Sequence, residues 1–208
     1  MINIHIGCGY KIGVNWLNYD ATPVALLEKI PVIGKIIKFN AKPFPKEIIF
    51  GNIVKKKFCK KEEADNIYCS HTLEHLAYND MLIALENIYS MLKPGGCFRL
   101  VVPSLESRIG RYMKNKDANE LIESLGFVKK NQHKNFLFYL RKLFGHSSHQ
   151  WMYDDQSLLK ELQKVGFINI RKCSFGDSRI KYFDEVEEKD RFEENNGLLP
   201  ATAFHCIK

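Results

Sequence analysis

Several features that would assign the chain to a broad class are missing from its 208 residues. It has no uninterrupted apolar run of about 18–20 residues, the length that a membrane-spanning helix needs. The first residues, MINIHIG, lead directly into a predicted strand and lack the regions of a signal peptide. The six cysteines include no C-x-x-C pair, which argues against a disulfide framework or a zinc finger. We therefore expect a cytoplasmic protein with reduced thiols.

The dinucleotide-binding fingerprint G-x-G-x-x-G is also incomplete. In INIHIGCGYKIGVNWLNYD (residues 2–20), an apolar strand leads into Gly7 and Gly9, but the third glycine is missing. Asp20 ends the next predicted strand, where its carboxylate can accept hydrogen bonds from both hydroxyls of a ribose. It follows Gly9 by only 11 positions, so the usual helix with its pyrophosphate site has no room. The stretch favours a nucleoside cofactor without phosphates over NAD, and a glycine turn without a ligand is the alternative.

Strand and helix patterns alternate along the chain, which predicts an α/β fold with an open, largely parallel sheet in a single domain. With 45% apolar residues, the chain can bury a sizeable core. The pattern indicates seven strands, near residues 2–6, 15–19, 47–50, 65–69, 97–103, 167–173 and 201–207.

Two amphipathic helices are predicted with their ends. In NDMLIALENIYSMLKPGG the apolar residues recur at helical spacing, Asp80 can cap the start, and KPGG stops the helix. In DDQSLLKELQKVGF the start is capped by Asp154 or Asp155 and the end lies at Gly166.

Two further segments do not fit the alternation. Residues 22–46 mix apolar residues with lysines and prolines, and residues 105–150 carry extra helical patterns. We expect both to form a cap over the carboxyl ends of the strands, where open α/β sheets bind their ligands.

The chain contains four motifs in a fixed order: INIHIGCG, VNWLNYD, ADNIYCSHTLEHL and IYSMLKPGGCFRLVVP. In this order and spacing they resemble class I S-adenosylmethionine-dependent methyltransferases, above all small type 11-like enzymes in which a short link replaces the first helix. The resemblance covers residues 2–104 and extends to about residue 170 through HSSHQWMYDDQSLLKELQKVGFINI. It implies a Rossmann-like, mostly parallel sheet with helices on both faces and an antiparallel last strand at residues 201–207.

The resemblance also implies a cofactor, S-adenosylmethionine, and the residues that bind it. Gly7, Cys8 and Gly9 would wrap its methionine part through backbone contacts, and Asp20 would hold the ribose.

Later strands would complete that cofactor site. Asn52 and Ile53 would lie next to the adenine, although the family usually has Gly-Asp where this chain has Gly51-Asn52. The amide oxygen of Asn52 can still accept from the adenine amino group, but without charge. Ser70 and His71 would end the fourth strand, where the family's chain passes under the sulfonium.

The segment HTLEH (residues 71–75) has a second interpretation. His71, Glu74 and His75 match the inverted zinc-peptidase pattern H-x-x-E-H, which needs a helix holding both histidines and a third ligand elsewhere. The order of the surrounding motifs argues against a zinc hydrolase, and we expect no metal. Glu74 and His75 then form a structural pair, or His75 faces the substrate.

A group that removes a proton is needed if the methyl acceptor is a hydroxyl. The segment GHSSHQWMY (residues 145–153) offers His149 as the first candidate for this general base and His146 as the second. The alternative is that both are loop residues that fix the cap. Trp151 in the same segment is expected to be core rather than a platform for substrate.

These features together predict methyl transfer to a small or medium acceptor, with a hydroxyl of a sugar or glycan precursor preferred on resemblance alone, in surface-polysaccharide biosynthesis. The alternatives are a catalytically degenerate cofactor-binding protein of the same fold and an RNA or protein methyltransferase. The net charge of +7 favours an anionic partner of some kind. Nucleic acid is disfavoured, because no Asp/Asn-Pro-Pro-Tyr follows the fourth strand. The segment IPVIGKIIKF (residues 30–39) could instead contact an anionic membrane surface.

Overall fold

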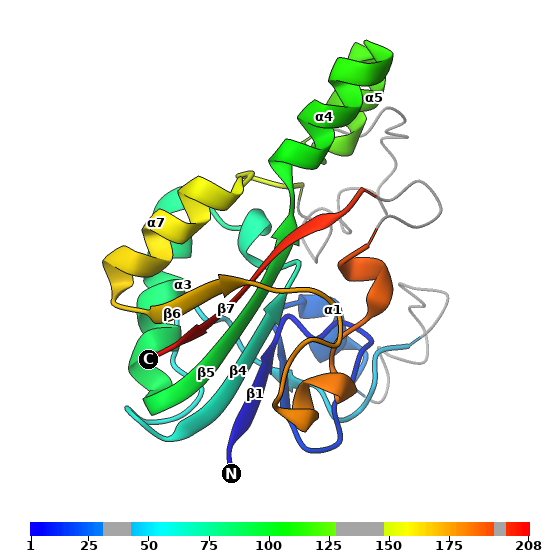
Figure 1. Cartoon of the computed structure of the whole chain (residues 1–208). Helices are drawn as coiled ribbons and strands as arrows, with labels where there is room; N and C mark the ends of the chain where they lie inside the picture. Colours follow the sequence, from blue (N-terminus) through cyan, green and yellow to red (C-terminus); the bar gives the residue numbers. More distant parts are fainter. Residues whose placement is uncertain (31–42, 128–147, 194–198) are drawn as a thin grey trace.

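The computed structural model describes residues 1–30, 43–127, 148–193 and 199–208. Its centre is a seven-stranded sheet with the strand order β3-β2-β1-β4-β5-β7-β6 (Figure 1). The strands are β1 (Asn3–Ile6), β2 (Leu17–Asp20), β3 (Ile49–Phe50), β4 (Ala64–Ser70), β5 (Leu92–Pro103), β6 (Ile168–Lys172) and β7 (Ala201–Ile207). All seven predicted strands are therefore present, within a few residues of the predicted bounds.

The pairing of the strands confirms the predicted mixed sheet. β3, β2, β1, β4 and β5 are parallel to their neighbours. β7 is antiparallel both to β5 and to β6, which lies outside it at the sheet edge. The carboxyl ends of the five parallel strands consequently share one edge of the sheet.

Side chains alternate along the central strands and build a separate core on each face of the sheet. On one face, Phe98 and Leu100 of β5 pack in the cluster that includes the apolar sides of α3 (Tyr78–Met91) and α7 (Asp155–Val165). On the other face, Val101 of β5 joins a smaller cluster. Its further members include three aromatic residues from outside the sheet, Trp16, Phe183 and Phe192. Figure 1 shows α3 and α7 together on one side of the sheet.

The second face is covered by short helical turns, η2 (Lys181–Glu185) and η3 (Lys189–Arg191). A buried arginine of β5 fastens this segment to the sheet. Arg99 donates to Glu187 and, over 2.8 Å, to Asp177, and also to the carbonyl oxygen of Ser174. Arg99 and Glu187 are 0% and 3% exposed, so the pair is held away from water.

The short link between β1 and β2 contains no helix, as predicted. Its shape is set by the buried side chain of Asn18, which accepts from the Gly13 nitrogen and donates to the carbonyl oxygens of Gly13 and Trp16. The Trp16 indole in turn donates to the carbonyl oxygen of Tyr182. One buried amide thus replaces the hydrogen bonds that a crossover helix would have supplied internally.

The predicted helix ends are partly right. Asp154 caps α7 in a capping box with Ser157, and Gly166 ends it with a φ of 111°. The predicted cap of α3 is wrong, because that helix begins at Tyr78 after Ala77 and Asp80 lies in its first turn. There the carboxylate still interacts favourably with the positive end of the helix dipole.

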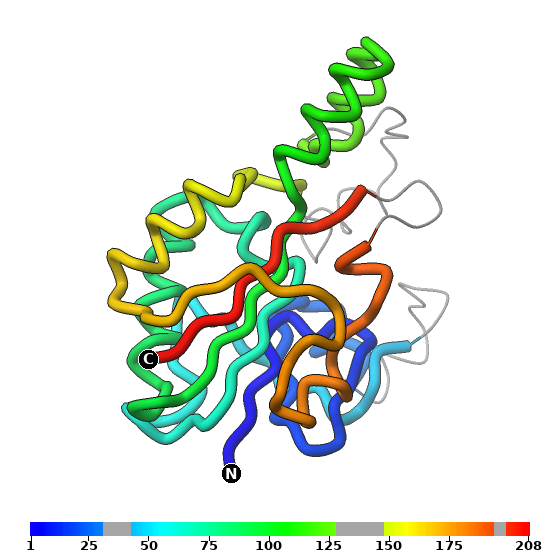
Figure 2. Tube along the Cα trace, viewed as in Figure 1, coloured from blue at the N-terminus to red at the C-terminus, as the bar shows by residue number. Residues whose placement is uncertain are grey.

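The two predicted cap segments are described only in part. Residues 22–46 include α1 (Pro23–Leu27). Residues 105–150 include α4 (Leu105–Asn115) and α5 (Ala118–Ser124). α4 follows β5 directly, and both helices project together from that end of the sheet (Figures 1 and 2). Within the described residues, no helix has the length and apolar character needed to cross a bilayer.

The buried Arg99–Glu187 pair makes a direct stability prediction. Glu187→Ala leaves the guanidinium buried with fewer partners, so we expect the free energy of unfolding to fall by about 3–5 kcal/mol. Glu188→Ala is the matched control, since the Glu188–Arg191 pair is nearly half exposed and such pairs contribute about 0–1 kcal/mol. Urea denaturation measures both, and equal losses for the two variants would contradict the assignment.

Candidate functional site

The glycine turn after β1 is shaped by two neighbouring segments. The backbone nitrogens of Gly7 and Cys8 both donate to the carbonyl oxygen of Tyr19 in β2, over 2.8 and 3.1 Å. Gly7 has a φ of 68°, and a Cβ there would lie 1.8 Å from the hydroxyl oxygen of Thr72, so only glycine fits. Gly9 has a φ of 53° with open space where a Cβ would be. The turn therefore leaves room beside Gly9 for a ligand.

Asp20 holds this turn in place. Its Oδ2 accepts from the Gly9 nitrogen over 2.9 Å, and its Oδ1 accepts from the Thr22 nitrogen over 2.7 Å. The side chain is only 7% exposed. The carboxylate at the end of β2 thus bridges the glycine turn and the start of α1, at the position where the ribose was expected.

Asn52 and Ile53 follow β3 and lie in a local turn. The Asn52 Oδ1 accepts from the Val54 nitrogen over 2.9 Å, and Ile53 is buried. The carbonyl oxygen of Ile53 accepts from Asn87 of α3, which ties the turn to the sheet's helical layer. The amide oxygen expected to meet the adenine is therefore engaged by the backbone, and the adenine contact stays a prediction.

Ser70 and His71 stand at the end of β4. The Ser70 hydroxyl is buried and has no hydrogen-bond partner among the described residues. His71 takes a φ of 49°, which turns the chain sharply, and its Nε2 lies 3.5 Å from the carbonyl oxygen of Arg191. Because β3, β2, β1 and β4 are neighbours in the sheet, the cofactor residues predicted from sequence share one edge.

The HTLEH segment does not form the α-helix that the zinc-hydrolase interpretation needs. It contains the single 3₁₀ turn η1 (Leu73–His75), and both histidines approach the same oxygen of Glu74. The Glu74 Oε1 is 3.3 Å from His71 Nδ1 and 3.9 Å from His75 Nε2. Burial alone would raise the pKa of Glu74, but the two histidines counter it and hold that pKa below its usual value.

His149 is brought against this group from far along the chain. Its ring stacks edge to face with that of His75, with 5.0 Å between centroids, and its Nδ1 lies 2.8 Å from the carbonyl oxygen of Leu125. Burial lowers the pKa of His149 below its usual value, which favours the neutral imidazole. His146, the second candidate base, lies outside the described residues. Trp151 is 44% exposed, so the expectation that it belongs to the core was wrong.

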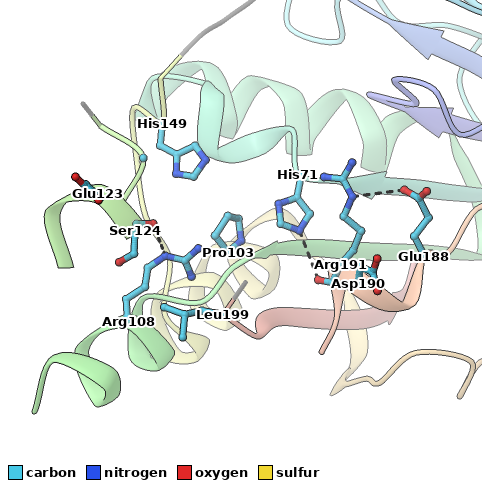
Figure 3. A pocket seen from close by; sticks show the side chains of 11 residues that line it. His71, Pro103, Arg108, Glu123, Ser124, His149, Glu188, Asp190, Arg191 and Leu199 are labelled. Atoms are coloured by element: carbon cyan, nitrogen blue, oxygen red, sulfur yellow. Dashed lines mark hydrogen bonds and ion pairs between the residues drawn. The ribbon is translucent and has the colours of Figure 1, made fainter. Parts of the chain in front are cut away.

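A cleft of about 620 Å³ opens where β4 and β5 end (Figure 3). His71 and Pro103 form its base, and His149 and Arg108 of α4 stand on one side. The opposite wall belongs to η3 and its surroundings, with Glu188, Asp190 and Arg191. The cleft thus combines two imidazoles with side chains of both charges.

Sequence reasoning missed the residues of this cleft other than His71 and His149. Arg108 is buried, and it donates to the carbonyl oxygens of Ser124 and Ser104 over 2.7 and 2.8 Å. Arg108 is one of two arginines in α4, and the sequence gives no signal that distinguishes its role. Arg191 and its acidic neighbours lie at the cleft because the bonds of Arg99 and the packing of Phe183 and Phe192 hold their segment against the sheet.

A family model described as a methyltransferase domain matches residues 4–172. The chain belongs to this family. As a class I fold with this family match, it is an S-adenosylmethionine-dependent methyltransferase. No match was found among the curated proteins with which the sequence was compared.

Solved structures show the same fold for the methyltransferase at low sequence identity. A S-adenosylmethionine-dependent methyltransferase from Methanosarcina mazei is 14% identical with a TM-score of 0.57, covering 99% of this chain and 91% of that one. One from Archaeoglobus fulgidus is 16% identical with a TM-score of 0.52, covering 99% and 85%. A structure of PigF with SAH is 15% identical with a TM-score of 0.50, covering 100% and 56%.

Asp20 makes a prediction with two separate readouts. In Asp20→Ala the nitrogens of Gly9 and Thr22 lose their acceptor, so the free energy of unfolding should fall by about 1–3 kcal/mol. The affinity for S-adenosylmethionine should fall at least about 10-fold, because hydrogen bonds to a charged group contribute about 1.5–3 kcal/mol. Calorimetry on folded protein measures the second effect, with the exposed Glu47→Ala as control. Unchanged affinity would refute the ribose assignment.

Proposed function

We propose that the methyltransferase transfers a methyl group from S-adenosylmethionine to a hydroxyl of a small or medium acceptor, such as a sugar or glycan precursor. The cleft at the ends of β4 and β5 carries this proposal. His71, which lines it, directly follows Ser70 at the end of β4, and its volume of about 620 Å³ suits an acceptor of this size. Its lining of imidazole, guanidinium and carboxylate groups can hydrogen-bond several hydroxyls at once.

The reaction would be an in-line displacement. The acceptor oxygen loses its proton and attacks the methyl carbon, while the carbon–sulfur bond breaks and leaves its electron pair on sulfur. S-adenosylhomocysteine and the methyl ether are the products. Much of the rate would come from holding the two reactants in line.

His149 is the group best placed to accept the proton. The Leu125 carbonyl oxygen can only accept a hydrogen bond, so it is the Nδ1 of His149 that carries the hydrogen. The Nε2 of the neutral ring is then left with a free lone pair. Since His149 lines the cleft, this lone pair is available to an acceptor hydroxyl there.

The mixed charge of the cleft favours an uncharged acceptor over nucleic acid. Arg108 and Arg191 are balanced by Glu123, Glu188 and Asp190 in the same lining. A site for a polyanion would instead present mainly cations. The side chains that give the chain its net charge of +7 therefore lie outside this cleft.

The test is a paired assay on one preparation. Calorimetry with S-adenosylmethionine and S-adenosylhomocysteine measures cofactor binding, and mass spectrometry follows methylation of a panel of sugars and sugar nucleotides. His149→Ala should lower kcat about 10²–10⁴-fold and change cofactor affinity little, because general base catalysis contributes about that factor. The neighbouring Ser148→Ala is the control.

Three outcomes would count against the proposal. Cofactor binding without transfer to any acceptor of the panel would favour the catalytically degenerate alternative. Methylation of RNA or protein in preference to the panel would contradict the acceptor class. A folded sample that binds neither ligand would contradict the cofactor assignment itself.

A further inference from the structure

Glu74, His75 and His149 form a group that the methyl-transfer mechanism does not explain. Each offers one ligand atom, and these atoms all lie within 4.8 Å of one another. They come from two distant parts of the chain, η1 and the segment before α7. A carboxylate and two imidazoles at such distances can bind a metal ion.

The state of Glu74 is the decisive observation. Its side chain is 0% exposed, yet neither carboxylate oxygen has a hydrogen-bond partner among the described residues. Leaving a buried carboxylate without donors is costly, and such groups are normally paired or bound to a metal. His75 adds a second orphan, since its Nδ1 is also buried without a partner. The group therefore contains buried oxygen and nitrogen atoms that have no hydrogen-bond partner among the described residues and could serve as metal ligands.

Nearby cations compensate Glu74 only partly. The contacts of His71 and His75 reach only one carboxylate oxygen, Oε1, over 3.3 and 3.9 Å. Arg108 adds a positive field, but the bonds of its guanidinium run to the carbonyl oxygens of Ser104 and Ser124 rather than to the carboxylate. Oε2 of Glu74 thus has neither an ion pair nor a hydrogen bond among the described residues, and it remains available to a cation.

The surroundings of His149 match those of a metal ligand. Its Nδ1 donates to the Leu125 carbonyl oxygen, which leaves the Nε2 lone pair free, and metal-binding histidines are usually oriented in this way. Hydrogen bonds to the backbone fix its place. The backbone nitrogen of His149 donates to the carbonyl oxygen of Gly126 over 3.0 Å. The backbone nitrogen of Gln150 donates to the carbonyl oxygen of Glu74 over 2.7 Å, and its side-chain Nε2 donates to that of His75 over 2.8 Å.

We propose that Glu74, His75 and His149 bind one divalent transition-metal cation, of which Zn²⁺ is the best probe. Two imidazoles and one carboxylate suit zinc, manganese or iron better than magnesium or calcium. Bonds of about 2.0–2.2 Å place ligand atoms roughly 3.0–3.5 Å apart, so the three side chains need to close by about 1 Å. Three protein ligands leave at least one coordination position of the cation open. Because His149 lines the cleft, we expect this open position to face the cleft.

The open position gives the cation a use that rests on the proposed function. An acceptor hydroxyl bound there would have a lowered pKa and would release its proton to water before attacking the methyl carbon. Both nitrogens of His149 would then be engaged, so the cation would replace His149 as the activator of the hydroxyl.

The test is a metal titration of the full chain after removal of bound metal with a chelator. Calorimetry with ZnCl₂ should show one equivalent, and both Glu74→Gln and His149→Ala should weaken binding at least about 100-fold, since even outer-shell partners cost about 10–100-fold. Glu188→Gln, which removes a carboxylate from the opposite wall of the same cleft, should leave the affinity for zinc unchanged. Gln has nearly the size of Glu and carries no buried charge, so Glu74→Gln should fold. His149→Ala provides the same test if it does not.

A second readout separates this site from the cysteines. Co²⁺ in place of zinc should give d–d bands without a sulfur-to-cobalt charge-transfer band, because no thiol is among the ligands. Absence of zinc binding, binding that survives both substitutions, or a sulfur band would each overturn the proposal. S-adenosylmethionine binding by the same samples is measured separately, so loss of the cofactor site and loss of the metal site cannot be confused.

Discussion

The short link between β1 and β2 is the constraint on which the cofactor edge depends. With no helix in this link, two buried polar side chains hold the strands and their turn in position. Asn18 closes the link on itself, and Asp20 joins the Gly9 nitrogen to the start of α1. The same carboxylate is expected to hold the ribose, so one side chain serves both the turn and the ligand. Because the link is too short for a helix, Asp20 has to stabilise the turn in addition to its expected binding of the cofactor.

Most of the fold could be predicted from hydrophobic periodicity and the positions of glycines. All seven strands and the ends of α7 could be predicted, because alternation, Asp154 and Gly166 are local signals. The start of α3 could not, since Ala77 caps it with no side-chain bond and leaves no mark in the sequence. The second face of the sheet could not be predicted either. It is covered by residues 181–191, whose place depends on the long-range contact between Arg99 and Glu187.

The candidate site also has a part that the sequence predicts and a part that it does not. Motif order was enough to bring Gly7, Asp20 and Ser70 to one edge, because parallel strands end together. The surroundings of Glu74 were not foreseen. HTLEH suggested two histidines on one helix, whereas the structure leaves His71 outside the turn η1. It brings in His149 through the hydrogen bond from the Gln150 nitrogen to the carbonyl oxygen of Glu74. No local pattern encodes a contact over that separation.

The position of β7 has a consequence for how the sheet is completed. β7 lies between β5 and β6, although it follows β6 in the chain. β6 is therefore synthesised before β7, and it has no strand to pair with until residues 201–207 have been made. During synthesis the apolar side of α7 can pack against α3, but β6 stays unpaired until β7 has been made. Loss of the last seven residues of the sheet would cost two strands, and with them the support of the cleft wall.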